Sequence, residues 1–390
     1  MAWRRYTVVC VVVVSFGCGG GTEGDGTTAG GSSTATDGTE PVSTDSSTAS
    51  TSDVADDTST SQGTEPATSD EGTDTDVPGD ACGNAPGQLF GPSMPWNTDI
   101  TEAPVAADSE AVVNYLEANI DPDVGFQVDF SLTIQEADSE TPREMFTPTG
   151  DFFSPDCDPA PVPVPEGGHL EGEKGYTCDG GGDCHLIVID REECRLYEQW
   201  RADFAGSGAY QGGCLAVWDL DRDYDETLRG DYCTSADASG LPIAALTFTA
   251  DEVASGEIAH AIRFIVPNAN IRDDIYVRPG THSTPATSGP AEAPPYSARL
   301  RLRADADLSG LSPAATVVAE AMQRYGIVLA DAGNITFTAA SDDFTTASWA
   351  EVEFGPHDLK ALSWTDFEVI DTGTPIVWSE GDCSREPITR

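Results

Sequence analysis

Beyond residue 120, short segments in which apolar and polar residues alternate with a period of two recur along the chain. Clear examples are residues 124–134 (VGFQVDFSLTI), 257–266 (EIAHAIRFIV) and 297–305 (SARLRLRAD). Such alternation predicts strands, and turn-forming Pro and Gly residues separate them. Long helices do not alternate with these strands, which disfavours a parallel α/β fold. We therefore predict a mainly β domain, a β-sandwich of jelly-roll type with a few short helices.

Three short helices are predicted from their end signals. Residues 109–120 (SEAVVNYLEANI) are one, and the TADE segment at 249–252 begins another with a capping box that ends before Gly256. The clearest is 312–326, with Ser312 as cap and Pro313 in the first turn.

Residues 184–204 (CHLIVIDREECRLYEQWRADF) predict a β-hairpin with its turn at 191–193. In that register one face is apolar and belongs in the core, with Leu186, Val188, Leu196 and Trp200. The other face is polar and aromatic and suits a ligand-binding cleft, with His185, Tyr197, Gln199 and Arg201. An ordinary solvated sheet face is the alternative interpretation.

The segment GEIAHAIRF places Glu257, His260 and Arg263 three residues apart. On a strand from Glu257 to Val266, His260 points away from the other two, so the three do not form one cluster. A histidine hydrogen-bonded inside the core and a catalytic histidine both fit this pattern. The small side chains of the two flanking alanines leave room for a ligand between Glu257 and Arg263.

Three arginines, Arg299, Arg301 and Arg303, fall on one face of the strand predicted at 297–305. They either pair with carboxylates on neighbouring strands or hold the carboxylate of a substrate.

The N-terminus predicts export. Two arginines and a short apolar run in residues 1–17 are typical of a signal peptide, and the run is too short to span a bilayer. The SFGC segment resembles the lipobox of bacterial lipoproteins, although Ser15 and Phe16 stand where that family has Leu and a small residue. The resemblance implies a lipid on Cys18 and a cell-envelope protein of the outer membrane or cell surface; a simply secreted protein is the alternative.

Residues 18–80 are rich in Gly, Ser, Thr and acidic residues, and 19–80 hold 14 acidic residues and no Lys or Arg. Such a segment buries too little apolar surface to fold and predicts a disordered tether. Residues 81–390 remain as a single globular domain, attached to the membrane only through the N-terminal lipid.

The whole chain carries 67 acidic and 19 basic residues, a formal net charge of −48. This surface repels nucleic acid and anionic polymers, so we expect no nucleic-acid partner. A polysaccharide is the expected partner if there is one, and the sequence leaves the oligomeric state open.

Eight of the ten cysteines lie in the domain: Cys82, Cys157, Cys178, Cys184, Cys194, Cys214, Cys233 and Cys383. An even count in an exported chain predicts disulfides. Cys178 and Cys184 flank a DGGGD loop that can close locally, and the other pairings are open.

The motifs for cofactors and metals are weak. The acidic run DLDRDYDE (219–226) lacks the glycine and the glutamate of a calcium loop, and the Cys and His spacings match no zinc site. There is no P-loop, HExxH or GxSxG. We therefore expect no metal and no cofactor.

Four segments, TSADASGLPI (234–243), GEIAHAIRF (256–264), RYGIVLAD (324–331) and FEVIDTG (367–373), together resemble a family of exported bacterial proteins without an assigned activity. Relatives usually have Trp where Cys233 stands, so a disulfide there is particular to this chain. The resemblance places six residues in or near its motif segments: Asp237, Glu257, His260, His282, Arg301 and Asp331.

Two classes of function follow. A carbohydrate-active enzyme would use carboxylates such as Glu257, Asp237 and Asp331 as acid and base, or His185 or His282 in a lyase. His260 is a further catalytic candidate, and a ligand would be bound by His185, Tyr197, Gln199, Arg263, Arg299 and Arg301. The alternative is a non-catalytic adhesion or structural protein of the envelope. In such a protein these carboxylates would not converge around a cleft.

Overall fold

The computed structural model describes residues 82, 84–85, 87–179, 182–205 and 209–390. They belong to one compact unit, Thr73–Arg390. The predicted signal peptide (1–17), the lipidation site Cys18 and the tether (18–80) lie outside the described residues. No helix in the described part is long and apolar enough to cross a lipid bilayer.

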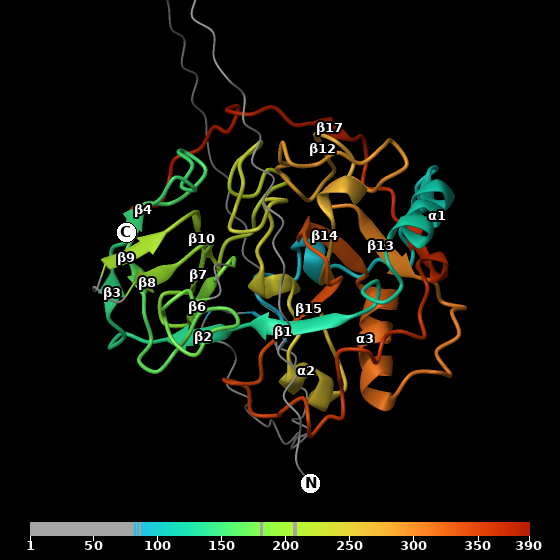
Figure 1. The fold of residues 1–390 in the computed structure, drawn as a ribbon, viewed down its shortest axis with the longest axis horizontal. Helices are drawn as coiled ribbons and strands as arrows, with labels where there is room; N and C mark the ends of the chain where they lie inside the picture. The colour runs from blue at the N-terminus through green and yellow to red at the C-terminus, as the bar shows by residue number, and fades with distance from the viewer. Residues whose placement is uncertain (1–81, 83, 86, 180–181, 206–208) are drawn as a thin grey trace, which may run out of the picture. The chain divides into compact units, whose positions relative to one another are not determined.

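The two largest sheets lie next to each other in Figure 1. The first has six strands in the order β1 (Val128–Leu132), β15 (Phe337–Ala340), β11 (Ile262–Val266), β14 (Ile327–Ala332), β13 (Arg299–Leu302) and β16 (Phe367–Val369). The second has four strands in the order β10 (Leu215–Asp219), β7 (Arg195–Gln199), β6 (Leu186–Asp190) and β2 (Ile134–Ala137).

Short strands form three smaller sheets. They are β4 (Thr147–Pro148), β9 (Ala209–Gly212) and β8 (Asp203–Ala205) in one, β3 (Arg143–Glu144) with β5 (Val162–Pro163), and β12 (Ile275–Tyr276) with β17 (Ile376–Val377). The 3-10 turns are η1 (Pro95–Asn97), η2 (Ala244–Leu246), η3 (Asn268–Asn270) and η4 (Trp364–Asp366).

The three predicted helices are confirmed as α1 (Ser109–Asn119), α2 (Ala250–Ser255) and α3 (Pro313–Arg324). The capping box of α2 is present, since Thr249 Oγ1 accepts from the backbone N–H of Glu252 while the Glu252 carboxylate accepts from that of Thr249. Gly256 ends α2 at φ 85°, a left-handed conformation that favours glycine.

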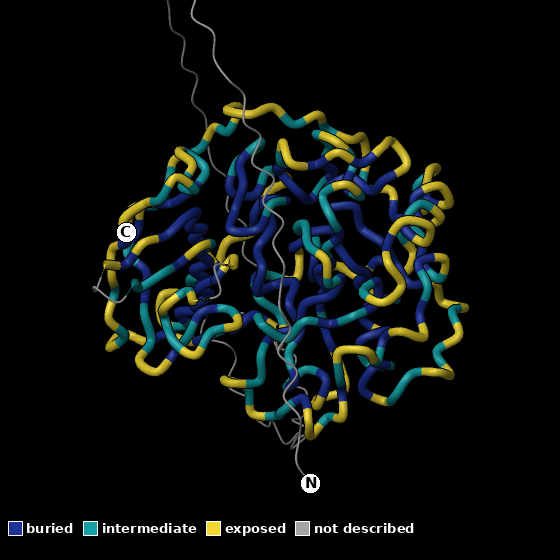
Figure 2. The backbone as a smooth tube through the Cα atoms, viewed as in Figure 1, coloured by how far each residue is buried: buried dark blue, intermediate teal, exposed yellow. Residues whose placement is uncertain are grey.

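Apolar side chains form three buried layers around the two sheets. The strands of both sheets are mostly buried (Figure 2). One layer joins the six-stranded sheet to α1 and α3, for example through Phe264, Leu116 and Val318. A second contains side chains of both sheets, such as Val328 and Ile189. A third covers the far face of the four-stranded sheet. The four-stranded sheet is therefore buried on both faces.

The prediction of a mainly β, sandwich-like fold with few short helices is confirmed. The pairing is mixed. β1 with β15, β11 with β14, β2 with β6 and β4 with β9 are parallel, whereas a jelly roll is antiparallel throughout.

The β6–β7 hairpin exists, but its predicted register is wrong by one residue. Val188 lies opposite Tyr197, and Leu186 lies opposite Gln199, because the turn takes the four residues 191–194. Tyr197 and Gln199 therefore share the face of Leu186 and Val188 and are fully buried. The predicted division into a core face and a ligand face is wrong, because apolar layers cover both faces of this sheet.

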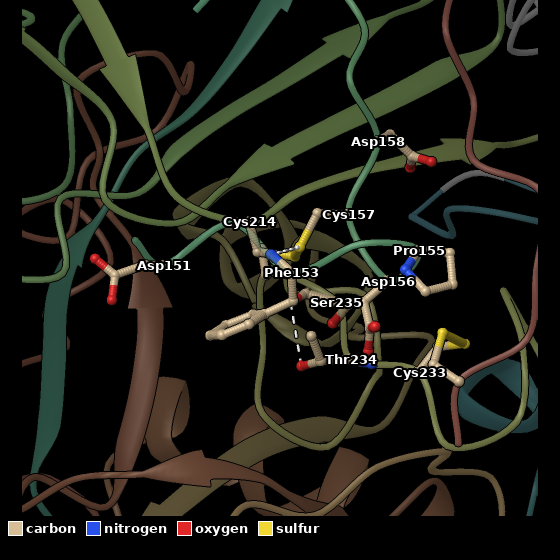
Figure 3. The surroundings of a disulfide bond; sticks show 12 residues. Asp151, Phe153, Pro155, Asp156, Cys157, Asp158, Cys214, Cys233, Thr234 and Ser235 are labelled. Carbon is tan, nitrogen blue, oxygen red and sulfur yellow. Dashed lines mark hydrogen bonds between the residues drawn. A yellow bond between two sulfur atoms is a disulfide. The ribbon is translucent and has the colours of Figure 1, made fainter. Parts of the chain in front are cut away.

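All eight domain cysteines form disulfides, as predicted: Cys82–Cys194, Cys157–Cys214, Cys178–Cys184 and Cys233–Cys383. Figure 3 shows the Cys157–Cys214 bridge, with Asp156 and Thr234 beside it. The Thr234 N–H donates to Asp156 Oδ1 at 2.9 Å, which fastens the 234–241 loop to this region. Four disulfides indicate an oxidising, extracellular type of environment.

Candidate functional site

A buried arginine on β11 is the centre of the candidate site. Ile262 and Phe264 point into the apolar layer under α1 and α3, so Arg263 points to the opposite face of the sheet. There Arg263 Nη1 donates to Thr338 Oγ1 on β15 at 2.7 Å, and Nη2 donates to Asp237 Oδ1 at 2.9 Å. The strand predicted over 257–266 is shorter than expected, since β11 begins only at Ile262.

A β-bulge brings Asp331 to the face of Arg263. Phe264 lies opposite Leu329, but the next residue, Ile265, lies opposite Asp331. Ala330 is the extra residue, and without it Asp331 would point toward the apolar layer. The bulge therefore moves Asp331 from the apolar face of the sheet to the face that carries Arg263.

The TSADASGLPI loop carries Asp237 into contact with Asp331. Ser239 N–H donates to the carbonyl of Ala330 at 2.9 Å, which fixes the loop beside the bulge. Asp237 is fully buried, and its Oδ2 has no hydrogen-bond partner among the described residues.

The surroundings of Asp331 favour its neutral form. Burial is the main cause that raises the pKa of Asp331 well above its ordinary value, and the nearby charge of Asp237 adds to the shift. Arg263 acts in the opposite direction. Asp331 is also partly exposed, so its carboxyl group can be reached from solvent.

His185 and Glu171 form an ion pair at the other side of Arg263. His185 Nδ1 donates to Glu171 Oε2 at 2.7 Å, and Nε2 donates to the carbonyl of Ala236 at 3.3 Å. Burial alone would lower the pKa of His185, but Glu171 raises it to about 9. Burial alone would raise the pKa of Glu171, but His185, with a contribution from Arg263, lowers it to about 2. Both groups are therefore charged at neutral pH.

This pair makes stability depend on pH in the alkaline range. The pKa of His185 rises from 6.5 to about 9 on folding, so its contribution is complete below pH 6.5 and is lost as the pH rises through about 9. We expect the free energy of unfolding to fall by up to ~3 kcal/mol over that range. Chemical denaturation at a series of pH values measures it.

The matched variant is His185→Gln, which has no imidazole to titrate. Its free energy of unfolding should change less over the same pH range than that of the native chain. Parallel curves for the two proteins would show that the pair does not cause the pH dependence. On the acid side, the contribution of Glu171 is complete above pH 4.5 and is lost as the pH falls through about 2.

We call Glu171, His185, Asp237, Arg263 and Asp331 the acid–arginine cluster. Four of its members were candidates from the sequence, and they lie in four separate segments of the chain. Comparison with protein-family models, curated proteins and solved structures finds no match for this chain. What the cluster does therefore has to be argued from its own geometry.

Sequence reasoning missed Glu171 and the neighbouring Asp129. Asp129 lies on β1 opposite Thr338, and burial is the main cause that raises its pKa. Ser131 Oγ links the two carboxylates, donating to Asp129 Oδ2 at 2.9 Å and to Glu171 Oε1 at 3.2 Å. Asp129 is the charged residue in the alternating segment 124–134, and that was a signal in the sequence. Glu171 lies in an irregular segment with no comparable signal.

Glu257 and His260 lie apart from this cluster, so the prediction that Glu257 converges with Asp237 and Asp331 is wrong. Glu257 precedes β11 with an exposed side chain that pairs with Arg324 at 3.1 Å. His260 is buried, with Nδ1 donating to Ala261 O at 2.8 Å and Nε2 to Glu252 Oε1 at 3.0 Å. Burial lowers and Glu252 raises the pKa of His260, with a net rise. This histidine supports the capping box of α2.

His282, Tyr197 and Gln199 also have other partners. His282 Nδ1 donates to Ala238 O at 2.7 Å, and burial lowers its pKa to about 4. The Tyr197 hydroxyl accepts from Arg143 at 2.8 Å. Gln199 Oε1 accepts from the hydroxyl of Tyr210 inside the third apolar layer.

Two of the aligned arginines bind the protein itself. Arg299 donates to three backbone carbonyls, those of Pro95, Thr98 and Tyr325. Arg301 pairs with Glu368 on β16 and also donates to carbonyls of the 100–103 loop. The predicted pairing with a carboxylate on a neighbouring strand is confirmed for Arg301, whereas the contacts of Arg299 are with backbone carbonyls.

Three groups of His, Cys, Asp or Glu residues in the described part lie close enough together to hold a metal ion. Each contains two cysteines of one disulfide, for example Cys233 and Cys383 with Asp156. Disulfide sulfurs are not thiolates, so these groups lack the ligands that a zinc site needs.

Proposed function

We propose that the chain is an exported, glycan-cleaving enzyme in which Asp331 is the proton donor. The observation that supports this is that the pKa values of two carboxyl groups in one cluster are shifted in opposite directions. Burial raises the pKa of Asp331 well above its ordinary value, while the ion pair with His185 lowers that of Glu171 to about 2. Such a divergence of pKa values identifies acid and base partners in hydrolytic sites.

The roles follow from the contacts. Asp331 is partly exposed and would protonate the oxygen of the leaving sugar. Asp237 is a positioning residue, because its negative charge keeps the proton on Asp331 and Arg263 holds its carboxylate. Asp237 lies too close to Asp331 to be the second carboxylate of a glycosidase, since those are ~5–9.5 Å apart. We assign that role to Glu171.

Incubating the purified full chain with a panel of neutral and acidic polysaccharides, followed by mass spectrometry of the products, tests the proposal. Asp331→Asn should lower the cleavage rate at least ~100-fold, because an amide cannot donate the proton. Glu257→Gln is the matched control and should keep full activity, since Glu257 lies on the surface beside Arg324. Intact polymers with the native chain, or equal effects of the two variants, would overturn the proposal.

The second candidate is a non-catalytic adhesion or structural protein of the envelope. The complete burial of Asp237 and its ion pair with Arg263 favour it, because such a pair can serve stability alone. In that case Asp331→Asn would change the free energy of unfolding and no polymer would be cleaved.

A lipid anchor at Cys18 is part of the proposal. It is supported by the resemblance of the SFGC segment to a lipobox and by the disulfides, which fit an extracytoplasmic location. Labelled palmitate should enter the native chain and not Cys18→Ser; equal labelling of both would refute the anchor.

A further inference from the structure

A groove of about 590 Å³ lies apart from the acid–arginine cluster. Its walls come from both large sheets, through Ile134 and Ile189 of the four-stranded sheet and Ala340 at the end of β15. The 3-10 turn η2, the start of α2 and the 341–345 segment complete it. Its volume is in the range of binding sites for small ligands, ~300–1,000 Å³.

Both basic side chains that line the groove, among the described residues, are paired with carboxylates. Arg191 pairs with Glu136 at 3.0 Å, and His260 pairs with Glu252 at 3.0 Å. Asp251 accepts from two backbone N–H groups of the 345–347 segment and keeps its negative charge. An anionic ligand would find no uncompensated positive charge there, so the lining favours a neutral ligand over an anionic one.

A buried acceptor in the lining lacks a donor. Gln88 Nε2 donates to the carbonyl of Ala259 at 2.8 Å, which fixes the orientation of the amide. Gln88 Oε1 is buried and has no hydrogen-bond partner among the described residues. This acceptor is closed to solvent, so the Gln88 amide fixes the wall of the groove and offers a ligand no open hydrogen-bonding atom at Oε1.

An exposed aromatic ring lies at the edge of the groove. Phe344 lines it and is 49 % exposed. Its ring packs against that of His169, with centroids 5.5 Å apart. His169 Nε2 lies 3.1 Å from Asp343 Oδ2, and its Nδ1 lies 3.1 Å from the carbonyl oxygen of Leu170. These two contacts hold the His169 ring in place under Phe344. A supported ring that faces solvent offers a surface for the apolar face of a sugar.

We propose that this groove is a binding site for a neutral oligosaccharide. A pyranose ring would pack on Phe344 at the edge of the groove. Hydroxyl groups of Ser341 and Thr345 also line the groove and suit a ligand rich in hydroxyls. The inference rests on the proposed function in taking a glycan as the ligand, but the site is separate from Asp331.

Isothermal titration calorimetry tests it with the purified full chain and hexamers of cellulose, xylan, laminarin and amylose as neutral probes. Hexamers of galacturonate and of glucuronate are the charged comparators, and both are anionic. We expect at least one neutral hexamer to bind and the charged hexamers to bind more weakly. Phe344→Ala should weaken binding about tenfold, and Phe344→Tyr should keep it, because the ring is retained.

Phe153→Ala is the matched control, since Phe153 is also 49 % exposed and does not line the groove. It should bind like the native chain. The inference is overturned if no neutral hexamer binds, if the charged hexamers bind more tightly, or if the Phe344→Ala and Phe153→Ala variants bind equally.

The failures of the two proposals are distinguishable. If binding depends on Phe344 but no polymer is cleaved, the enzyme proposal is overturned and the binding groove is supported. If cleavage depends on Asp331 but binding is unchanged in Phe344→Ala, the groove is overturned and the enzyme is supported.

Discussion

Asp158→Asn should lower the free energy of unfolding by about 3–5 kcal/mol. Asp158 is fully buried, and its two oxygens pair with two arginines, Arg229 at 2.6 Å and Arg385 at 2.7 Å. They also accept from the backbone N–H groups of Val217 and Ile388. Removing the negative charge leaves two buried guanidinium groups without compensation, which is the costly way to break a buried ion pair.

The matched control is Asp151→Asn. Asp151 pairs with Arg201 at 2.9 Å, but the side chains are 33 % and 47 % exposed. A solvent-exposed pair contributes about 1 kcal/mol or less, so this variant should unfold almost like the native chain. Urea denaturation of both variants measures the difference. Equal losses would mean that the burial of Asp158 does not decide its contribution.

Removing the Cys233–Cys383 disulfide should destabilise the fold by about 5 kcal/mol. This bridge joins residues 150 positions apart, so it restricts the unfolded chain far more than a local bridge does. It also holds the C-terminal segment that carries Arg385 and Ile388 to Asp158. The variant is Cys233→Ala with Cys383→Ala, studied by the same denaturation.

The internal comparison is Cys178→Ala with Cys184→Ala. These cysteines are 6 positions apart, and closing so short a loop contributes only about 2 kcal/mol. The long-range variant should therefore lose about 3 kcal/mol more than the local one. Losses of the same size would show that contacts in the folded state, rather than the entropy of the unfolded chain, determine both effects.

Features that depend on neighbours in the chain were predictable. Helix α2 begins and ends where Thr249, Glu252 and Gly256 indicate, because its capping bonds join residues three or four apart. The same holds for α3, where Ser312 accepts from the N–H of Ala315. The Cys178–Cys184 bridge was predictable because the two cysteines are only 6 positions apart.

The hairpin register was not predictable from alternation. Both faces of β6 and β7 are buried, so polar and apolar residues do not mark an outer face there. The turn also places Cys194 at φ 52°, in the left-handed region, next to its disulfide partner Cys82. This turn is held by a disulfide between residues 112 positions apart, so its length cannot be predicted from the four turn residues alone.

The sequence by itself determined a mainly β domain with three short helices and a cysteine content typical of exported proteins. It also identified Asp237, Arg263 and Asp331 as individual candidate residues. Only the tertiary structure decided that these residues meet. Alternation assigns a face only while the ladder is regular, and the bulge between β11 and β14 shifts Asp331 to the face of Arg263. The same long-range packing placed Glu257 on the surface, because its partner Arg324 lies 67 residues further along the chain.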